Sequence, residues 1–149
     1  MNNLTFRPIK NEDEDVLKQW LASDPQSKKF IVEYGDVPAW LKLLRDDERL
    51  GFILRSDDID VGFIDLEKNE HIGYFTFFVA PQFRGLGLGV KLLNGMELLL
   101  RQFNITVAEG YFEPENIASR NTLARAGFDL ADEVDKDGMV RASKTILQD

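Results

Sequence analysis

A buried strand, a glycine-rich loop and an amphipathic helix are predicted one after another between residues 71 and 103. The run from His71 to Val79 is almost continuously apolar, which predicts a central strand buried on both faces. The loop carries three glycines in five residues, from Gly85 to Gly89. One apolar face of the predicted helix is formed by Leu92, Leu93, Met96, Leu99, Leu100 and Phe103. Together these segments predict a sheet with a helix packed against it.

The rest of the chain supplies further strands and helices on both sides of this unit. Alternation and apolar runs predict strands at residues 4–9, 50–54, 61–66 and 105–112, and two more around a turn at 135–138. Helices are expected after Asn11, from Asp36, and from Asn116 to a stop at Gly127. The order β-α-α-β-β-β-α-β-α-β-β predicts a mixed α/β fold, with a single domain over residues 1–149.

The residue composition excludes several kinds of chemistry. The chain has no cysteine, so a disulfide framework, a zinc ribbon and a cysteine nucleophile are impossible. Its one histidine, His71, cannot form a histidine-rich metal site, and we expect no metal. The formal net charge of -8 argues against binding to nucleic-acid phosphates and is compatible with a cationic partner.

No segment has the pattern of a membrane span or a secretion signal. No stretch approaches the roughly 18–20 uninterrupted apolar residues of a spanning helix. The opening Met1–Arg7 lacks the basic and apolar regions of a signal peptide. We therefore expect a cytoplasmic protein without a membrane partner, either a monomer or a homodimer.

The glycine-rich loop predicts an anion site. Its glycines let backbone N–H groups approach a ligand closely, and the helix N-terminus that follows adds partial positive charge. Arg84 at the loop entrance adds a fixed cation, so the expected ligand is a phosphate or pyrophosphate. A plain strand-to-helix turn would need only one or two glycines. A Walker loop and a dinucleotide fingerprint both fit poorly, because Val90 and Lys91 follow Gly89.

The loop also resembles that of a known family. The segment Arg84-Gly85-Leu86-Gly87-Leu88-Gly89, after Val79-Ala80-Pro81, is similar to the acyl-CoA loop of the GCN5-related N-acetyltransferases, Arg/Gln-x-x-Gly-x-Gly/Ala. Asn116-Ile117-Ala118-Ser119 and Ala126-Gly127-Phe128 are similar to a downstream signature of the ribosomal-protein alanine acetyltransferase branch. The opening Leu4-Thr5-Phe6-Arg7-Pro8 resembles that branch too. The resemblance covers nearly the whole chain in matching order.

This resemblance implies a fold and a reaction. The implied fold is a central, mostly antiparallel mixed sheet that splays between its fourth and fifth strands, flanked by about four helices. The implied reaction moves an acetyl group from acetyl-CoA to a primary amine by direct attack in a ternary complex. The expected acceptor is a small cationic amine or a peptide N-terminus. Glu33 and Tyr34 lie in the segment that walls the acceptor site in this family, and we expect them to bind the amine.

The resemblance also assigns the contacts of the acetyl donor. Phe78, Val79 and Ala80, at the end of the fourth strand, would pair with the pantetheine amides. The Val79 N–H would polarise the thioester carbonyl. The pyrophosphate would lie on the loop formed by Arg84, Gly85, Leu86, Gly87, Leu88 and Gly89.

The implied proton donor lies on the helix after the fifth strand. Asn116 is an expected N-cap of this helix and a contact to the donor. Ser119 would protonate the departing thiolate, or would serve only as a helix residue. Many family members place a tyrosine acid at the position of Leu123, so that role is not carried over.

The general base is not carried over either. Family bases are often glutamates on the fourth strand, at the position of Gly73 in this chain. His71 is expected in a solvated turn, whereas Glu109 and Tyr111 on the fifth strand could reach the cleft directly or through a water. The missing base keeps open a non-catalytic acyl-CoA sensor or interaction module of the same fold and, more weakly, a nucleotide-phosphate binder.

Overall fold

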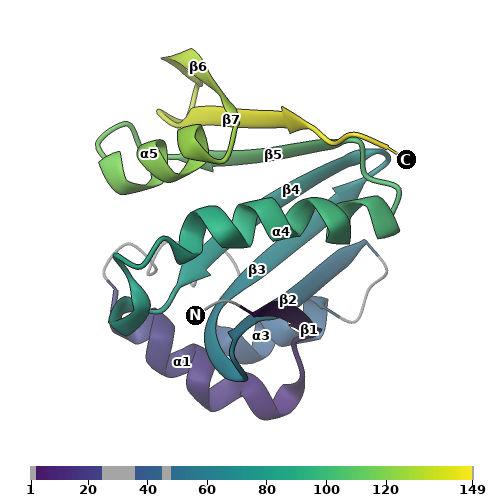
Figure 1. Cartoon of the computed structure of the whole chain (residues 1–149), viewed down its shortest axis with the longest axis vertical. Helices are drawn as coiled ribbons and strands as arrows, with labels where there is room; N and C mark the ends of the chain where they lie inside the picture. The colour runs from purple at the N-terminus through teal and green to yellow at the C-terminus, as the bar shows by residue number, and fades with distance from the viewer. Residues whose placement is uncertain (1–2, 25–35, 45–47, 149) are drawn as a thin grey trace.

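The computed structural model describes residues 3–24, 36–44 and 48–148 (Figure 1). Its strands are β1 (Leu4–Pro8), β2 (Arg49–Ser56), β3 (Ile59–Asn69), β4 (Ile72–Val79), β5 (Val107–Phe112), β6 (Asp129–Val134) and β7 (Val140–Thr145). Its helices are α1 (Glu14–Ala22), α3 (Val37–Leu43), α4 (Leu88–Gln102) and α5 (Ile117–Arg125), with short 3-10 turns η1 (Asn11–Asp13) and η3 (Pro81–Phe83). The predicted order of strands and α-helices is confirmed.

The strands form one mixed sheet in the order β1-β2-β3-β4-β5-β7-β6. All neighbours are antiparallel except β4 and β5, which run parallel. These two strands pair only where Ile72–Tyr74 face Val107–Glu109, and beyond that point they diverge (Figure 1). The expected sheet that splays between its fourth and fifth strands is confirmed.

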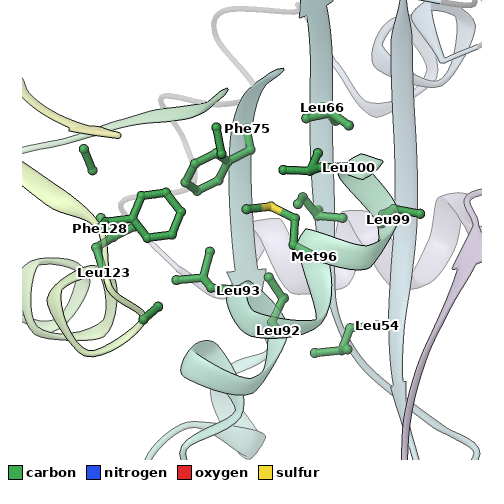
Figure 2. Packing of buried hydrophobic residues seen from close by; sticks show 14 of the residues in the cluster. Leu54, Leu66, Phe75, Leu92, Leu93, Met96, Leu99, Leu100, Leu123 and Phe128 are labelled. Atoms are coloured by element: carbon green, nitrogen blue, oxygen red, sulfur yellow. The ribbon is translucent and has the colours of Figure 1, made fainter. Parts of the chain in front are cut away.

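Helices α4 and α5 pack on one face of this sheet. Figure 2 shows Leu92, Leu93 and Met96 of α4 among side chains from the strands, with Leu123 and Phe128 alongside. Five of the six residues predicted for the apolar face of α4 are buried, and Phe103 packs at the edge of the cluster just beyond the helix. Each buried side chain of this size stabilises the fold by roughly 1.5–3 kcal/mol. None of the described helices is long and apolar enough to cross a membrane.

Helices α1 and α3 cover the opposite face. Trp20, Leu21 and Trp40 pack there against Phe63 of β3 and Phe78 of β4. Helix α3 begins at the predicted position. Asp36 caps it, because its carboxylate accepts the Ala39 N–H at 2.8 Å. A second polar contact holds this layer, since Trp40 Nε1 donates to the buried Asp65 carboxylate at 3.0 Å.

Strand β4 differs from its prediction in one respect. Its long apolar run predicted burial on both faces, and Phe75 and Phe78 are indeed buried. Thr76 between them is exposed, and Tyr74 is half-buried. The difference arises because β5 leaves β4 after Tyr74, so one face of the central strand opens into a cleft.

Candidate active site

A cleft of about 730 Å³ opens where β4 and β5 part. Its walls are the two diverging strands, the loop after β4, the start of α4 and the first turns of α5. A cleft between parting strands exposes backbone groups that a neighbouring strand would otherwise occupy, so an extended ligand can pair with them. The fold therefore provides a slot for a linear molecule with amide groups.

The backbone of Val79 faces this slot. In an antiparallel ladder, opposed residues alternate between hydrogen-bonded and non-bonded pairs. Ala80 N–H donates to Val61 O at 2.8 Å, which makes the adjacent pair, Gly62 and Val79, the non-bonded one. The N–H and C=O of Val79 consequently point away from β3, towards the side that β5 has left. This is the orientation that an oxyanion donor at Val79 requires.

The loop after β4 presents its backbone at the start of α4. Gly85 and Gly87 both adopt left-handed conformations, with φ of 81° and 77°, and Gly87 is the N-cap of α4. A Cβ at Gly89 would lie 2.9 Å from Thr122 Cγ2, so α5 can approach α4 closely only at a glycine. The loop thus brings unpaired N–H groups of a helix N-terminus to the cleft, an arrangement suited to a phosphate.

Two of the predicted donor contacts do not line the cleft. Ala80 is fully buried, and its N–H is already bonded to Val61. The Leu86 side chain is 56% exposed, and Leu86 is not among the residues that line the cleft. The structure does bring the other predicted residues together there: Phe78, Val79, Arg84, Gly85, Gly87, Leu88, Gly89, Asn116 and Ser119.

The Arg84 side chain extends towards α1. Its Nε donates to Val79 O at 2.8 Å, and its Nη2 donates to Asp24 Oδ2 at 2.7 Å. The guanidinium carbon lies 5.2 Å from the centre of the Phe78 ring, on the face of the sheet that α1 and α3 cover. The sequence predicted a cation directed at pyrophosphate; in this structure the guanidinium lines the cleft and contacts Asp24 and the Phe78 ring.

Asn116 and Ser119 form the first turn of α5. Asn116 Oδ1 accepts the Ser119 N–H at 3.1 Å, so the predicted N-cap is confirmed. Both residues line the cleft, and Ser119 is half-buried there. Leu123, one turn further along, is 2% exposed and contributes an apolar wall.

Glu109 and Tyr111 lie two residues apart on β5 and form a bonded pair. The Tyr111 hydroxyl donates to Glu109 Oε2 at 2.6 Å. Partial burial and this bond to a carboxylate raise the pKa of Tyr111 to about 12. At neutral pH the cleft therefore contains a protonated phenol beside an acceptor carboxylate.

The structure shows what surrounds Gly73, the position at which family members often carry a glutamate base. A Cβ at Gly73 would lie 3.0 Å from Leu66 Cδ1 and 3.1 Å from Ile105 Cδ1, inside the core. A glutamate at this position would be directed away from the cleft. His71 lies exposed in the β3–β4 turn, and Glu33 and Tyr34 fall outside the described residues.

Sequence reasoning missed several acidic residues of the cleft. Glu67 faces Tyr74 across β3 and β4, and Tyr74 faces Glu109 across β4 and β5. This row lies on the α1/α3 face, because Asp65, two residues before Glu67, bonds Trp40 there. The described lining contains the carboxylates Asp24, Asp65, Glu67, Glu109 and Glu113, and only two arginines. Glu109 was predicted, and the alternation of Phe63, Asp65 and Glu67 along β3 is the signal that could have found Asp65 and Glu67.

Nothing in the described part of the chain suggests a metal centre. It contains no group of three or more histidine, aspartate or glutamate side chains placed to hold a metal ion. Asp65, the most buried carboxylate in the cleft wall, instead pairs with Arg49 at 2.8 Å.

Comparisons with known proteins agree with this geometry. The sequence matches the acetyltransferase (GNAT) domain family over residues 3–129, and no curated protein matches it. A solved aminoglycoside acetyltransferase, AAC(6')-Ib in complex with coenzyme A and kanamycin, is 20% identical with a TM-score of 0.77, covering 96% of this chain and 95% of that chain. Spermidine N-acetyltransferase from Vibrio cholerae in complex with CoA and spermine is 15% identical with a TM-score of 0.78, covering 96% and 95%. The N-acetyltransferase PseH from Campylobacter jejuni in complex with acetyl coenzyme A is 14% identical with a TM-score of 0.73, covering 96% and 99%.

Proposed function

The chain belongs to the acetyltransferase (GNAT) family, and from this premise we propose that its cleft transfers the acetyl group of acetyl-CoA to a primary amine on a small cationic molecule. Family membership makes the chain an acetyl-CoA-dependent N-acetyltransferase, which disfavours a non-catalytic sensor.

One observation carries the choice of acceptor: the two faces of the sheet at the cleft have opposite electrostatic character. On the α4 side, the glycine loop and the helix N-terminus favour the pyrophosphate of the donor. On the α1/α3 side, where Arg84 is paired with Asp24, Glu67 and Glu109 flank Tyr74 in one row across three strands. Glu67 also contacts Arg49 at 3.5 Å. A cationic amine gains from these carboxylates and from the tyrosine ring, whereas an anionic acceptor would be repelled.

The proposed reaction uses four groups of the cleft. The amine nitrogen attacks the thioester carbon, a C–N bond forms, and the Val79 N–H stabilises the oxyanion of the tetrahedral intermediate. The surplus proton on nitrogen passes to Glu109, directly or through a water, while the neutral Tyr111 phenol keeps that carboxylate oriented. The C–S bond then breaks, and the thiolate takes a proton from the Ser119 hydroxyl, which recovers it from solvent.

A peptide N-terminus is the alternative acceptor. The signature of Asn116, Ser119 and Gly127 resembles the ribosomal-protein alanine acetyltransferase branch, which the comparisons do not confirm. Two of the similar structures are complexes with the amines kanamycin and spermine, and this supports the small cationic acceptor. We therefore rank the small amine first and keep peptides in the test.

The test is thiol release from acetyl-CoA across a panel of aminoglycosides, polyamines, amino acids and short peptides. We expect turnover with amines that carry two or more positive charges. The Glu67→Gln variant should raise KM for these amines by about tenfold, while Glu133→Gln, an exposed acidic residue outside the cleft wall, should not. Release that no amine stimulates would reject the proposal, and a preference for neutral peptides would move the acceptor to a peptide N-terminus.

A further inference from the structure

We propose that the Arg84 side chain is a positioning residue, which fixes the end of β4 against α1 and does not bind the phosphates of the donor. This inference rests on the proposed acetyl transfer at Val79. The backbone of the glycine loop remains the expected pyrophosphate site, so the two ends of Arg84 serve different purposes. Its main chain is part of the glycine loop, whereas its guanidinium contacts the end of β4, where the thioester is expected.

The peptide unit after Val79 is held by a hydrogen bond at each end. Its carbonyl oxygen accepts from Arg84 Nε at 2.8 Å, and its N–H, on Ala80, donates to Val61 O at 2.8 Å. A peptide group bonded at both ends cannot rotate freely. The Val79 N–H lies on the preceding peptide unit, which the pairing of Phe78 with Phe63 holds in the ladder. The two bonds to Arg84 and Val61 fix the peptide unit on the other side of the Val79 Cα. Only one of them belongs to the sheet; Arg84 supplies the other.

The Arg84 guanidinium lies on a layer of aromatic rings. It lies over Phe78, whose ring stacks on Phe63 at 5.2 Å with an interplanar angle of 18°. Trp20 of α1 stacks on the same Phe78 ring at 6.2 Å. The Arg84 charge is therefore seated on the aromatic layer beneath α1, and its Nη2 reaches Asp24 just beyond that helix. With two contacts on this face and a third at the Val79 carbonyl in the plane of the sheet, the guanidinium is engaged away from the start of α4.

The ion pair between Arg84 and Asp24 is partly open to solvent. The Arg84 side chain is 46% exposed, and an ion pair as open as this one with Asp24 contributes little to the free energy of folding. What the contact does provide is geometry at the atom that must meet the developing oxyanion. Small misplacements of such a donor slow catalysis strongly. Removing the side chain should therefore alter turnover while leaving the fold and the loop backbone in place.

The discriminating experiment compares two donors, acetyl-CoA and S-acetylpantetheine, which keeps the thioester and lacks the pyrophosphate. For a positioning residue, Arg84→Ala should lower kcat by the same factor with both donors, about tenfold or more, and change the Kd of CoA by less than about twofold. Arg84→Lys should not rescue turnover, because an ammonium cannot reproduce the guanidinium fork. A loss confined to acetyl-CoA, with weaker CoA binding and rescue by lysine, would overturn the inference, as would unchanged kcat with both donors.

Two further variants distinguish the loss of the Arg84–Asp24 contact from a general effect on the fold. Asp24→Asn should lower kcat in the same direction, and combining it with Arg84→Ala should add little, because both act on one contact. Arg55→Ala is the matched control, since Arg55 also bonds one carboxylate, on Asp60, and one carbonyl, on Asp58, outside the cleft walls. Its kcat should match that of the parent. If the parent protein released no thiol with any amine, the proposed function itself would be rejected. That outcome differs from a loss of kcat in Arg84→Ala that is confined to acetyl-CoA, which would overturn only the inference about Arg84.

Discussion

The proposed role of Ser119 as proton donor depends on the position of its hydroxyl group. Ser119 sits in the first turn of α5, on the cleft wall, with its N–H capped by Asn116 at 3.1 Å. The cap holds the turn through the backbone, so the side chain remains available for proton transfer.

We expect Ser119→Ala to lower kcat about a hundredfold, while the Kd for acetyl-CoA changes by less than about threefold. The physical reason is that a general acid acts on the leaving thiolate, whereas donor binding relies on backbone groups. Steady-state kinetics and calorimetry with acetyl-CoA measure the two quantities. Ser119→Thr, which keeps a hydroxyl, is the control, and full activity in the alanine variant would remove Ser119 from the mechanism.

The pair of Glu109 and Tyr111 makes a prediction about alkaline pH. The pKa of Tyr111 is raised to about 12, so the folded protein keeps this proton between about pH 10 and 12, where the unfolded chain loses it. The resulting contribution to stability is complete below pH 10 and is lost as the pH rises towards 12. The free energy of unfolding should fall more steeply across this window in the parent than in Tyr111→Phe.

Absorbance titration of the phenolate checks the same point directly. The chain has three tyrosines, and the step near pH 12 should disappear in Tyr111→Phe. In Glu109→Gln the step should move down towards pH 10, because the carboxylate charge that favours the phenol is gone. A late step that survives in Tyr111→Phe would show that another tyrosine carries it.

At the scale of elements, the loop between β4 and α4 makes the sharpest test of donor binding. Gly87→Glu should weaken acetyl-CoA binding about a hundredfold or more, because a carboxylate would stand where the pyrophosphate is expected. Gly138→Glu in the β6–β7 turn is a matched control. Both glycines have similar left-handed φ, 77° and 79°, and neither has an atom within 4 Å of an added Cβ.

The matched pair separates binding from strain. Both variants carry the same backbone penalty and should lower Tm by similar amounts. Calorimetry with acetyl-CoA should find weak binding only in Gly87→Glu. Equal affinities in the two variants would place the donor somewhere other than this loop.

At the scale of the whole molecule, the cleft divides the sheet into two halves. The three residue pairs between Ile72–Tyr74 and Val107–Glu109 are the only β4–β5 ladder among the described residues. The half with β1 to β4 supplies the glycine loop, and the half with β5 to β7 leads into α5 with Asn116 and Ser119. A donor that contacts the loop and α5 together would join them (Figure 1).

Acetyl-CoA should therefore protect both halves at once. At one hundred times its Kd it should stabilise the fold by about 2.7 kcal/mol, which is visible as a rise in Tm. Hydrogen exchange should slow at the amides of Phe77 and Val79 and in the first turn of α5, while the β1–β2 ladder stays unchanged. Protection limited to one half would contradict a donor that spans the cleft.

Much of the fold follows from local sequence signals. The amphipathic face of α4, the caps at Asp36 and Asn116 and the left-handed Gly127 all depend on residues within one or two helical turns. The glycine loop is equally local, because the backbone conformations of Gly85 and Gly87 are intrinsic to glycine. These features could be predicted residue by residue.

The arrangement of the cleft was decided by contacts between distant parts of the chain. The β4–β5 ladder ends at Tyr74, so β4 is less buried beyond that residue. The registers of β3, β4 and β5 place Glu67 and Glu109 on either side of Tyr74. The same pairing leaves Gly73 facing the core. Arg84 reaches Asp24, sixty residues earlier, which no local pattern could indicate. The sequence by itself determined the elements, their order and the anion-binding loop, since these rest on short-range interactions. Only the tertiary structure decided which side chains face the acceptor, because strand register and the packing of α1 and α3 set those directions.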